Sequence, residues 1–182
     1  MKKIGFLGLG VMGLHMALNV DRKMDVEVVG FDVSEEQLRK YQAAGGTAAA
    51  SVEELYRTCD VILQMLPTHE ILRHSVEEAI RLGQPGTVIV DLSSAAPDII
   101  LDLYRKAKEA GMYLLDSPVS GGNPMAEAGT LSIMTGGDRS AFDAVEPVLA
   151  CMGTAVYTGG PGSGDTTKLV NNMIGGAILV AI

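Results

Sequence analysis

The amino-acid sequence predicts an α/β protein built on a doubly wound, mainly parallel sheet. Segments with strand and helix patterns alternate along the 182-residue chain, which is typical of a parallel sheet with helices on both faces. Apolar residues make up 47% of the chain, enough for a globular core. Aromatic residues make up only 4%, so we expect that core to be aliphatic, with Met side chains filling its gaps.

The first two thirds of the chain supply the alternating elements. The predicted strands are short apolar runs at residues 3–7, 26–31, 47–49, 61–65, 87–91 and 113–115. Between them, helices are predicted to begin near Val11, Ser34, Ser51, Thr68 and Pro97. Ser34 and Ser51 are each followed by acidic residues, a pattern typical of helix N-caps, and Pro97 suits the first position of a helix.

The pattern changes after Asp116. A glycine-bounded strand is predicted at residues 129–137, a helix at 141–152 and a short strand at 154–157, and we expect them to extend the sheet at one edge. A glycine-rich break follows, and residues 165–182 have the pattern of a helix. The predicted organisation is therefore one α/β domain over residues 1–163 and the start of a long helix over 164–182.

This last helix is nearly all apolar over residues 173–182 and contains no stop signal. A helix that is apolar on every side has to be buried, and nothing else in the chain is left to bury its far end. We therefore expect a linking helix that leads into a further domain outside this sequence. The alternative is a C-terminal helix docked on its own domain.

The most informative segment for function is the turn after the first strand, which reads GLGVMG and comprises Gly8, Leu9, Gly10, Val11, Met12 and Gly13. Gly8 permits a turn with positive φ, Gly10 lets a pyrophosphate approach the backbone, and Gly13 lets the following helix pack closely on the strand. The start of that helix offers N–H groups and a positive dipole end to phosphate. Asp32, which ends the second strand, is placed to accept hydrogen bonds from adenosine ribose hydroxyls.

This order of strand, glycine turn, helix, strand and acid predicts a Rossmann-like, dinucleotide-binding domain. The alternative is a strand–helix–strand unit with an incidental glycine turn. Asp32 would repel a 2′-phosphate, and no Arg follows it in the next four residues. We therefore expect NAD as the cofactor, with NADP as the alternative.

Residues 116–122 read DSPVSGG and supply candidate substrate groups. They follow a predicted strand at its carboxyl end, where ligands bind in doubly wound sheets. Ser120 offers a hydroxyl, and Gly121 and Gly122 can present N–H groups to a carboxylate. The alternative for this segment is an ordinary glycine turn.

Lys168 and Asn172 lie four residues apart on the last predicted helix and therefore share a face. An ammonium and an amide on one face can hold a single substrate oxygen. The alternative is a solvated surface lysine, which the apolar neighbours of Lys168 make less favourable. A further candidate is Ser94, which follows a predicted strand and is expected to touch the cofactor. The alternative is that Ser94 caps the helix that begins at Pro97, a role that it can combine with a cofactor contact.

Composition excludes several classes of partner. The formal net charge is −8 and no run of Lys or Arg occurs, so neither nucleic acid nor an anionic membrane is expected. No apolar stretch approaches the length of a membrane span, and the charged start is not followed by a cleavage site. Cys59 and Cys151 adjoin predicted core segments, which favours free buried thiols and a cytoplasmic location. The three histidines have no ligand partners in sequence, so no metal is expected.

Taken together, these motifs resemble the β-hydroxyacid dehydrogenase family, also called 3-hydroxyisobutyrate dehydrogenase-like. The matching features run in order over essentially the whole chain: GLGVMG with MALN at 16–19, MLP at 65–67, DLSSAAP at 91–97, DSPVSGG at 116–122, GTLSIM at 129–134 and GSGDTTKLVNN at 162–172. The resemblance implies an oxidoreductase that moves a hydride between a nicotinamide and a small β-hydroxy or β-oxo carboxylic acid.

The resemblance also implies roles for particular residues. The family's essential lysine falls on Lys168 and its substrate-orienting amide on Asn172. Its carboxylate-binding loop falls on Ser120, Gly121 and Gly122, and its nicotinamide-side contacts fall on Leu66, Pro67 and Ser94. Met65, directly before Leu66, is a further expected cofactor contact. In this family a second, mostly helical domain follows the linking helix, and the full-length protein is expected to be a homo-oligomer.

Within the family, the loop at residues 122–134 looks more like tartronate semialdehyde reductases (2-hydroxy-3-oxopropionate reductases) than 3-hydroxyisobutyrate dehydrogenases. The Asn123–Pro124 pair and the Thr-Leu-Ser sequence at residues 130–132 carry this preference. The expected reaction is reduction of tartronate semialdehyde to glycerate. The alternatives are a 3-hydroxyisobutyrate dehydrogenase and a dinucleotide-binding module without catalysis, which would have no need of Lys168 and Asn172.

Overall fold

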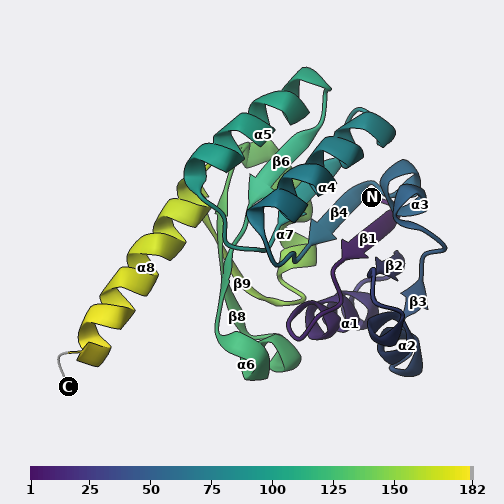
Figure 1. Cartoon of the computed structure of the whole chain (residues 1–182), viewed down its shortest axis with the longest axis horizontal. Helices are drawn as coiled ribbons and strands as arrows, with labels where there is room; N and C mark the ends of the chain where they lie inside the picture. The colour runs from purple at the N-terminus through teal and green to yellow at the C-terminus, as the bar shows by residue number, and fades with distance from the viewer. Residues whose placement is uncertain (181–182) are drawn as a thin grey trace.

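The computed structural model describes residues 1–180 and confirms the doubly wound α/β fold (Figure 1). Its strands are β1 (Lys3–Leu7), β2 (Glu27–Phe31), β3 (Thr47–Ala48), β4 (Val61–Gln64), β5 (Val88–Asp91), β6 (Tyr113–Asp116), β7 (Val119–Ser120), β8 (Leu131–Gly136) and β9 (Gly153–Gly159). Its helices are α1 (Gly13–Lys23), α2 (Glu35–Ala43), α3 (Val52–Thr58), α4 (His69–Leu82), α5 (Pro97–Glu109), α6 (Gly122–Ala128), α7 (Arg139–Leu149) and α8 (Ser163–Val180).

One sheet contains all the described strands in the order β3-β2-β1-β4-β5-β6-β8-β7, with β9 paired to β8. β1 to β6 are parallel, β8 runs antiparallel to β6 and β7, and β9 is parallel to β8. The strand order reverses between β1 and β4. In doubly wound sheets a ligand crevice opens at such a point, outside the carboxyl ends of the strands. The predicted cofactor residues after β1 and β4 therefore flank the same crevice.

Helices cover both faces of the sheet, and each face has its own apolar core. α1, α2, α6 and α7 pack on one face, over buried residues such as Phe6 and Leu63. α3, α4 and α5 pack on the other face, over Ile62 and Ile89. Because alternate residues of a strand point to opposite faces, the continuous apolar runs of β4 and β5 serve both cores. Full burial of each such aliphatic side chain contributes about 1.5–3 kcal/mol.

The predicted strands of the first two thirds all form, with ends that differ by no more than one residue from those expected. The strand, helix and strand predicted after Asp116 also form, as β8, α7 and β9, and extend the sheet at one edge as expected. β7 and α6 were not predicted. They occupy a segment with the sequence pattern of a glycine-rich loop.

The predicted helix caps are correct in part. The Ser51 hydroxyl accepts the N–H of Glu54 and caps α3 as expected. Ser34 stands at the N-cap position of α2, but its side chain makes no capping hydrogen bond. Ser94 does not cap α5, because Ala96 stands at the N-cap position, directly before Pro97. Its contact with the cofactor stays a prediction.

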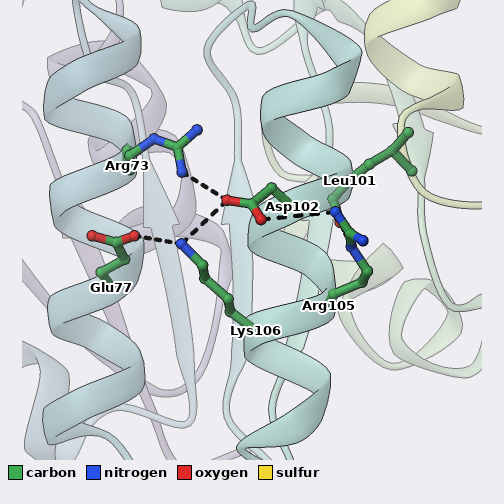
Figure 2. A network of polar contacts seen from close by, with 6 residues as sticks. All are labelled: Arg73, Glu77, Leu101, Asp102, Arg105 and Lys106. Carbon is green, nitrogen blue, oxygen red and sulfur yellow. Dashed lines mark hydrogen bonds and ion pairs between the residues drawn. The ribbon is translucent and has the colours of Figure 1, made fainter.

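An ion-pair network joins α4 to α5 across their outer surface (Figure 2). Asp102 accepts a hydrogen bond from Arg73 at 2.7 Å and lies 3.1 Å from the Lys106 ammonium, which in turn donates to Glu77 at 2.8 Å. Arg73 and Lys106 hold the pKa of Asp102 below its ordinary value. Ion pairs of this kind at the surface contribute little to stability.

α8 projects away from the body of the domain (Figure 1). It starts against β6, β8 and β9. Beyond that start, the side chains of Leu169, Val170, Met173, Ile174 and Ile178 are exposed. The alternative of a helix docked on its own domain is therefore wrong for the described residues, and residues 181–182 lie outside them. Over residues 1–180, no helix combines the length and the apolar character needed to cross a membrane.

Candidate functional site

The glycine turn after β1 has the geometry that its sequence predicts. Gly8 has a φ of 91°, and a Cβ there would collide with the carbonyl oxygen of Met65. A Cβ on Gly13 would collide with the carbonyl oxygen of Gly8, so glycine is needed for α1 to start so close to β1. A Cβ on Gly10 would meet no protein atom within 4 Å, which leaves that side of the turn open to a ligand.

The start of α1 is also free to bind an anion. No side chain caps it, and its first turn contains no acidic residue. The first N–H groups of a helix and the positive end of its dipole are then available to phosphate. The turn and the helix start together fit the pyrophosphate of a dinucleotide.

Asp32 connects the end of β2 to the glycine turn. One of its carboxylate oxygens accepts the N–H of Leu9 at 2.7 Å, and the other accepts the N–H of Ser34 at 2.8 Å. These bonds hold the carboxylate beside the turn, and each oxygen keeps acceptor capacity for a further donor. Hydrogen bonding of Asp32 to ribose hydroxyls stays a prediction that this geometry allows.

A cavity of about 650 Å³ opens at the point where the strand order reverses. This volume is in the range of small-molecule sites. Its walls contain most of the predicted cofactor residues: Gly8, Gly10, Val11, Met12, Gly13, Asp32, Met65, Leu66 and Pro67. Leu9 is not among them, because its side chain is fully buried and only its N–H reaches Asp32.

The far wall of this cavity is not predicted from the sequence. α2, α3 and α4 supply it with Gln37, Val52, Glu53, Tyr56, Ile71, His74, Ser75 and Glu78. On its floor, the hydroxyls of Tyr56 and Ser75 lie 2.9 Å apart, and Ser75 donates to the buried Gln64 at 2.8 Å. No local motif marks these residues, since their convergence depends on how three helices pack on the sheet.

A smaller cavity of about 270 Å³ adjoins the first at Leu66 and Pro67, which line both. Ser93 and Ser94, from the loop after β5, also line it. Ser94 is exposed, whereas Ser93 is buried and its hydroxyl accepts the N–H of Leu66 at 2.8 Å. Ser93 therefore holds the loop after β4 to the loop after β5, whereas the sequence pattern points to Ser94.

The predicted substrate loop begins at the end of β7. Ser120 pairs with Ser132 of β8. Gly121 and Gly122 have φ values of 136° and 68°, conformations that favour glycine, and they lead directly into α6. Both glycines are exposed, as a loop that binds a carboxylate through N–H groups requires. Carboxylate binding by this loop stays a prediction.

Lys168 lies on α8 close to its start and is half-buried. Burial lowers the pKa of its ammonium. Among the described side chains, it forms no ion pair or hydrogen bond. Leu169 and Val170 are exposed, so these apolar neighbours do not shield Lys168 as expected, and Asn172 is exposed as well. α8 and β7 both contact β8. The two predicted substrate segments, which contain Lys168 and Ser120, therefore lie beside the same strand.

Three buried carboxyl groups gather at the base of α8. Asp91 and Asp116 end the neighbouring strands β5 and β6, and Asp165 lies in the first turn of α8. Burial raises the pKa of Asp91 to about 6 and that of Asp165 to about 7, and it also raises the pKa of Asp116. The sequence motifs contain all three residues, but the packing of α8 that brings them together could not be predicted. In the described part of the chain, no group of three His, Cys, Asp or Glu side chains could hold a metal ion.

The chain resembles known proteins over nearly its whole length. A 2-(hydroxymethyl)glutarate dehydrogenase from Eubacterium barkeri is 38% identical, over 99% of this chain and 61% of its own length. A mitochondrial 3-hydroxyisobutyrate dehydrogenase from Drosophila melanogaster is 38% identical, over 95% of this chain and 54% of its own length. The chain thus spans little more than half the length of these relatives.

A solved structure of 3-hydroxyisobutyrate dehydrogenase from Mycobacterium tuberculosis, with L-serine, has the same fold. Its TM-score is 0.91 at 35% identity, covering 96% of this chain and 60% of that one. Residues 3–160 also match the family model described as the NAD binding domain of 6-phosphogluconate dehydrogenase. With the open glycine turn, Asp32 and the cavity beside them, this match shows that the chain belongs to that family of NAD-binding domains.

Proposed function

We propose that the full-length protein is an NAD-dependent hydroxyacid dehydrogenase that acts on a small β-hydroxy or β-oxo carboxylic acid. The observation that carries this proposal is Lys168, a half-buried lysine without an ion pair among the described side chains, on the helix that leaves an NAD-binding domain. The names of the relatives support the same class of reaction. A domain that only binds dinucleotide has no need of such a lysine.

The cofactor side of the site is assigned as follows. The open face of Gly10 and the free start of α1 bind the pyrophosphate, and Asp32 accepts the ribose hydroxyls. We assign the nicotinamide side to Leu66 and Pro67, which line both cavities, and to Ser94, which lines the smaller one. Met65, in the larger cavity, is a further cofactor contact. When bound, the cofactor supplies or accepts the hydride.

On the substrate side, we assign Lys168 as the general acid and base that transfers the proton. In reduction, negative charge develops on the aldehyde oxygen, and an ammonium beside it stabilises that charge and donates a proton. In oxidation, the neutral amine takes the hydroxyl proton, and a lowered pKa makes this form more available. We assign Asn172 to orient the same oxygen, and Ser120, Gly121 and Gly122 to hold the carboxylate.

Within this class, we propose tartronate semialdehyde as the substrate and glycerate as its product, on the basis of the loop at residues 122–134. 3-Hydroxyisobutyrate is the competing candidate, and the named relatives favour it. The test is kcat/KM of the full-length protein on tartronate semialdehyde, 3-hydroxyisobutyrate, L-serine and 2-(hydroxymethyl)glutarate. The highest value identifies the substrate, and no turnover of any of them would contradict the proposed class of reaction.

We expect the protein to prefer NADH to NADPH because Asp32 would repel a 2′-phosphate. The Asp32→Asn variant should narrow this preference. It should also weaken the binding of both cofactors, since an amide has one oxygen for the two N–H groups that the carboxylate now accepts. Glu36→Gln is the matched control, because Glu36 is exposed and pairs with Lys40. Tighter binding of NADPH than NADH by the unmodified protein would contradict the assignment.

For the 182-residue chain alone, we expect dinucleotide binding with poor turnover. The exposed side of α8 leaves water free to reach the region around Lys168, and the substrate is then held on one side only. Calorimetric titration with NADH beside an activity assay tests this. Turnover equal to that of the full-length protein would contradict it.

We also propose a reducing cytosol as the location and a homo-oligomer as the state of the full-length protein. Cys59 and Cys151 are both buried free thiols, which suits a reducing compartment. The exposed apolar side chains of α8 support association, because such a surface is normally covered.

A further inference from the structure

The first turn of α8 is joined to the domain by a side chain that the proposed function does not use. Asp165, which is 1% exposed, accepts the N–H of Ala95 at 2.8 Å through its Oδ1 atom. Ala95 belongs to the loop after β5, which also places Ser93 and Ser94 on the wall of the smaller cavity. One carboxyl group therefore connects the helix that carries Lys168 to the loop on the cofactor side.

The same turn of α8 is held from the sheet by Asp116. Its two carboxylate oxygens accept the N–H groups of Gly162 at 2.9 Å and of Asp165 at 3.0 Å. Gly164 packs so closely that a Cβ there would collide with the carbonyl oxygens of Asp116 and Met134. Asp116 thus fixes where α8 starts, and Asp165 fixes how its first turn lies against the loop after β5.

The carboxyl group of Asp165 does not pair with Lys168. The two residues are three apart on α8, a spacing at which oppositely charged side chains can meet on a helix surface. Within the described part of the chain, however, the only hydrogen bond to the Asp165 carboxyl comes from Ala95, and burial alone lowers the pKa of Lys168. Asp165 can therefore hold the helix without neutralising the ammonium.

We propose that Asp165 is a positioning residue, which sets Lys168 relative to the cofactor-side loop through its hydrogen bond to Ala95. This inference rests on the proposed function, because it assigns Asp165 a task only if Lys168 is catalytic. The contribution of Asp165 is geometric. Its burial next to Asp91 and Asp116 disfavours a negative charge on its carboxyl group, but an oxygen of the neutral carboxyl still accepts the N–H of Ala95. A misplacement of about 1 Å at a reacting group can lower the rate about 10²-fold.

Three variants of the full-length protein separate the position of the acceptor oxygen from the ability of the side chain to ionise. Asp165→Asn keeps an oxygen acceptor in place and cannot ionise. Asp165→Glu keeps an ionisable carboxyl and displaces it by one methylene, and Asp165→Ala removes both the acceptor and the ionisable group. We expect kcat within about threefold of wild type for Asp165→Asn and a loss of about 10–100-fold for the other two, with NADH affinity within about twofold throughout.

Thr167→Ala is the matched control, because Thr167 is exposed on the same turn and its hydroxyl donates to the Ser163 carbonyl within α8. It should leave kcat unchanged. Wild-type kcat in Asp165→Ala, or a loss in Asp165→Asn as large as in Asp165→Glu, would overturn the proposal. If Asp165→Ala is too unstable to assay, the comparison of Asp165→Asn with Asp165→Glu decides.

Lys168→Ala, assayed in parallel, separates this inference from the function on which it rests. Undiminished turnover in Lys168→Ala would contradict the catalytic role of Lys168, and the positioning role of Asp165 would then be contradicted as well. A large loss in Lys168→Ala together with full activity in Asp165→Glu overturns the positioning role alone.

Discussion

Lys168 is the side chain on which the proposed chemistry depends most directly. We expect Lys168→Ala in the full-length protein to lower kcat about 10²–10⁴-fold, the usual contribution of a general acid, and to leave NADH affinity nearly unchanged. The matched control is Lys40→Ala, which removes an exposed lysine on α2. Near-normal kcat would contradict the catalytic role. Loss of NADH binding with intact chemistry would make Lys168 a cofactor contact instead.

The buried acids at the base of α8 predict a pH dependence of stability. Asp165 and Asp91 have pKa values raised by burial to about 7 and about 6, from an ordinary value of 3.8. Between pH 3.8 and these raised pKa values, the folded protein holds protons that the unfolded chain releases. Their contribution to the free energy of unfolding is therefore full below pH 3.8 and is lost as the pH rises through about 6 and 7.

The variant Asp165→Asn removes one of these ionisations. Its free energy of unfolding should decline less between about pH 5 and pH 8 than that of wild type, as measured by urea titration at several pH values. Asp98→Asn, an exposed acid on α5, should follow wild type. An Asp165→Asn profile parallel to that of wild type would show that Asp165 does not hold a proton in the folded state.

Single residues differ in how well the sequence predicts them. The tasks of Gly8 and Gly10 follow from local backbone rules, and the structure has the geometry expected of both. Local sequence does not predict whether Ser93 or Ser94 contacts the neighbouring loop. The contact depends on which side chain faces the loop after β4, and only the packing of two strand ends decides this.

At the scale of elements, Asn19 holds α6 against α1. Its amide, 8% exposed, donates to the carbonyl oxygens of Ala126 at 2.9 Å and of Glu127 at 3.2 Å. We expect Asn19→Leu to lower the free energy of unfolding by about 1–3 kcal/mol, because acceptors at the end of α6 lose their donor. Urea unfolding measures this. Asn123→Leu, on the exposed start of α6, is the control, and equal losses in the two variants would contradict the assignment.

The elements themselves were predictable where they repeat a pattern over enough residues. β1 and β4 are apolar runs bounded by turn residues, and their predicted ranges agree closely with the structure. α6 is only seven residues long and buries Ala126 alone, so it has no apolar period that a sequence could reveal. β7 is shorter still and forms only because β8 folds back beside it.

At the scale of the whole molecule, the order of strands explains why the predicted cofactor residues meet. Residues after β1, β2 and β4 converge because the strand order reverses between β1 and β4, and this follows from the alternating pattern of the sequence. The wall from α2, α3 and α4 and the acid cluster below α8 do not follow from it. They depend on contacts between segments far apart in the chain, for which the sequence contains no local signal.

The variant Gly10→Val tests most directly whether the glycine turn binds the pyrophosphate of NAD. A side chain at this position meets no protein atom within 4 Å, and the backbone there does not require glycine. We therefore expect Gly10→Val to keep the Tm of wild type, with a change in stability within about 0.5 kcal/mol. Calorimetric titration with NADH should show affinity reduced at least about tenfold, because the valine fills the space of the pyrophosphate. A folded Gly10→Val protein that binds NADH as tightly as wild type would contradict the account.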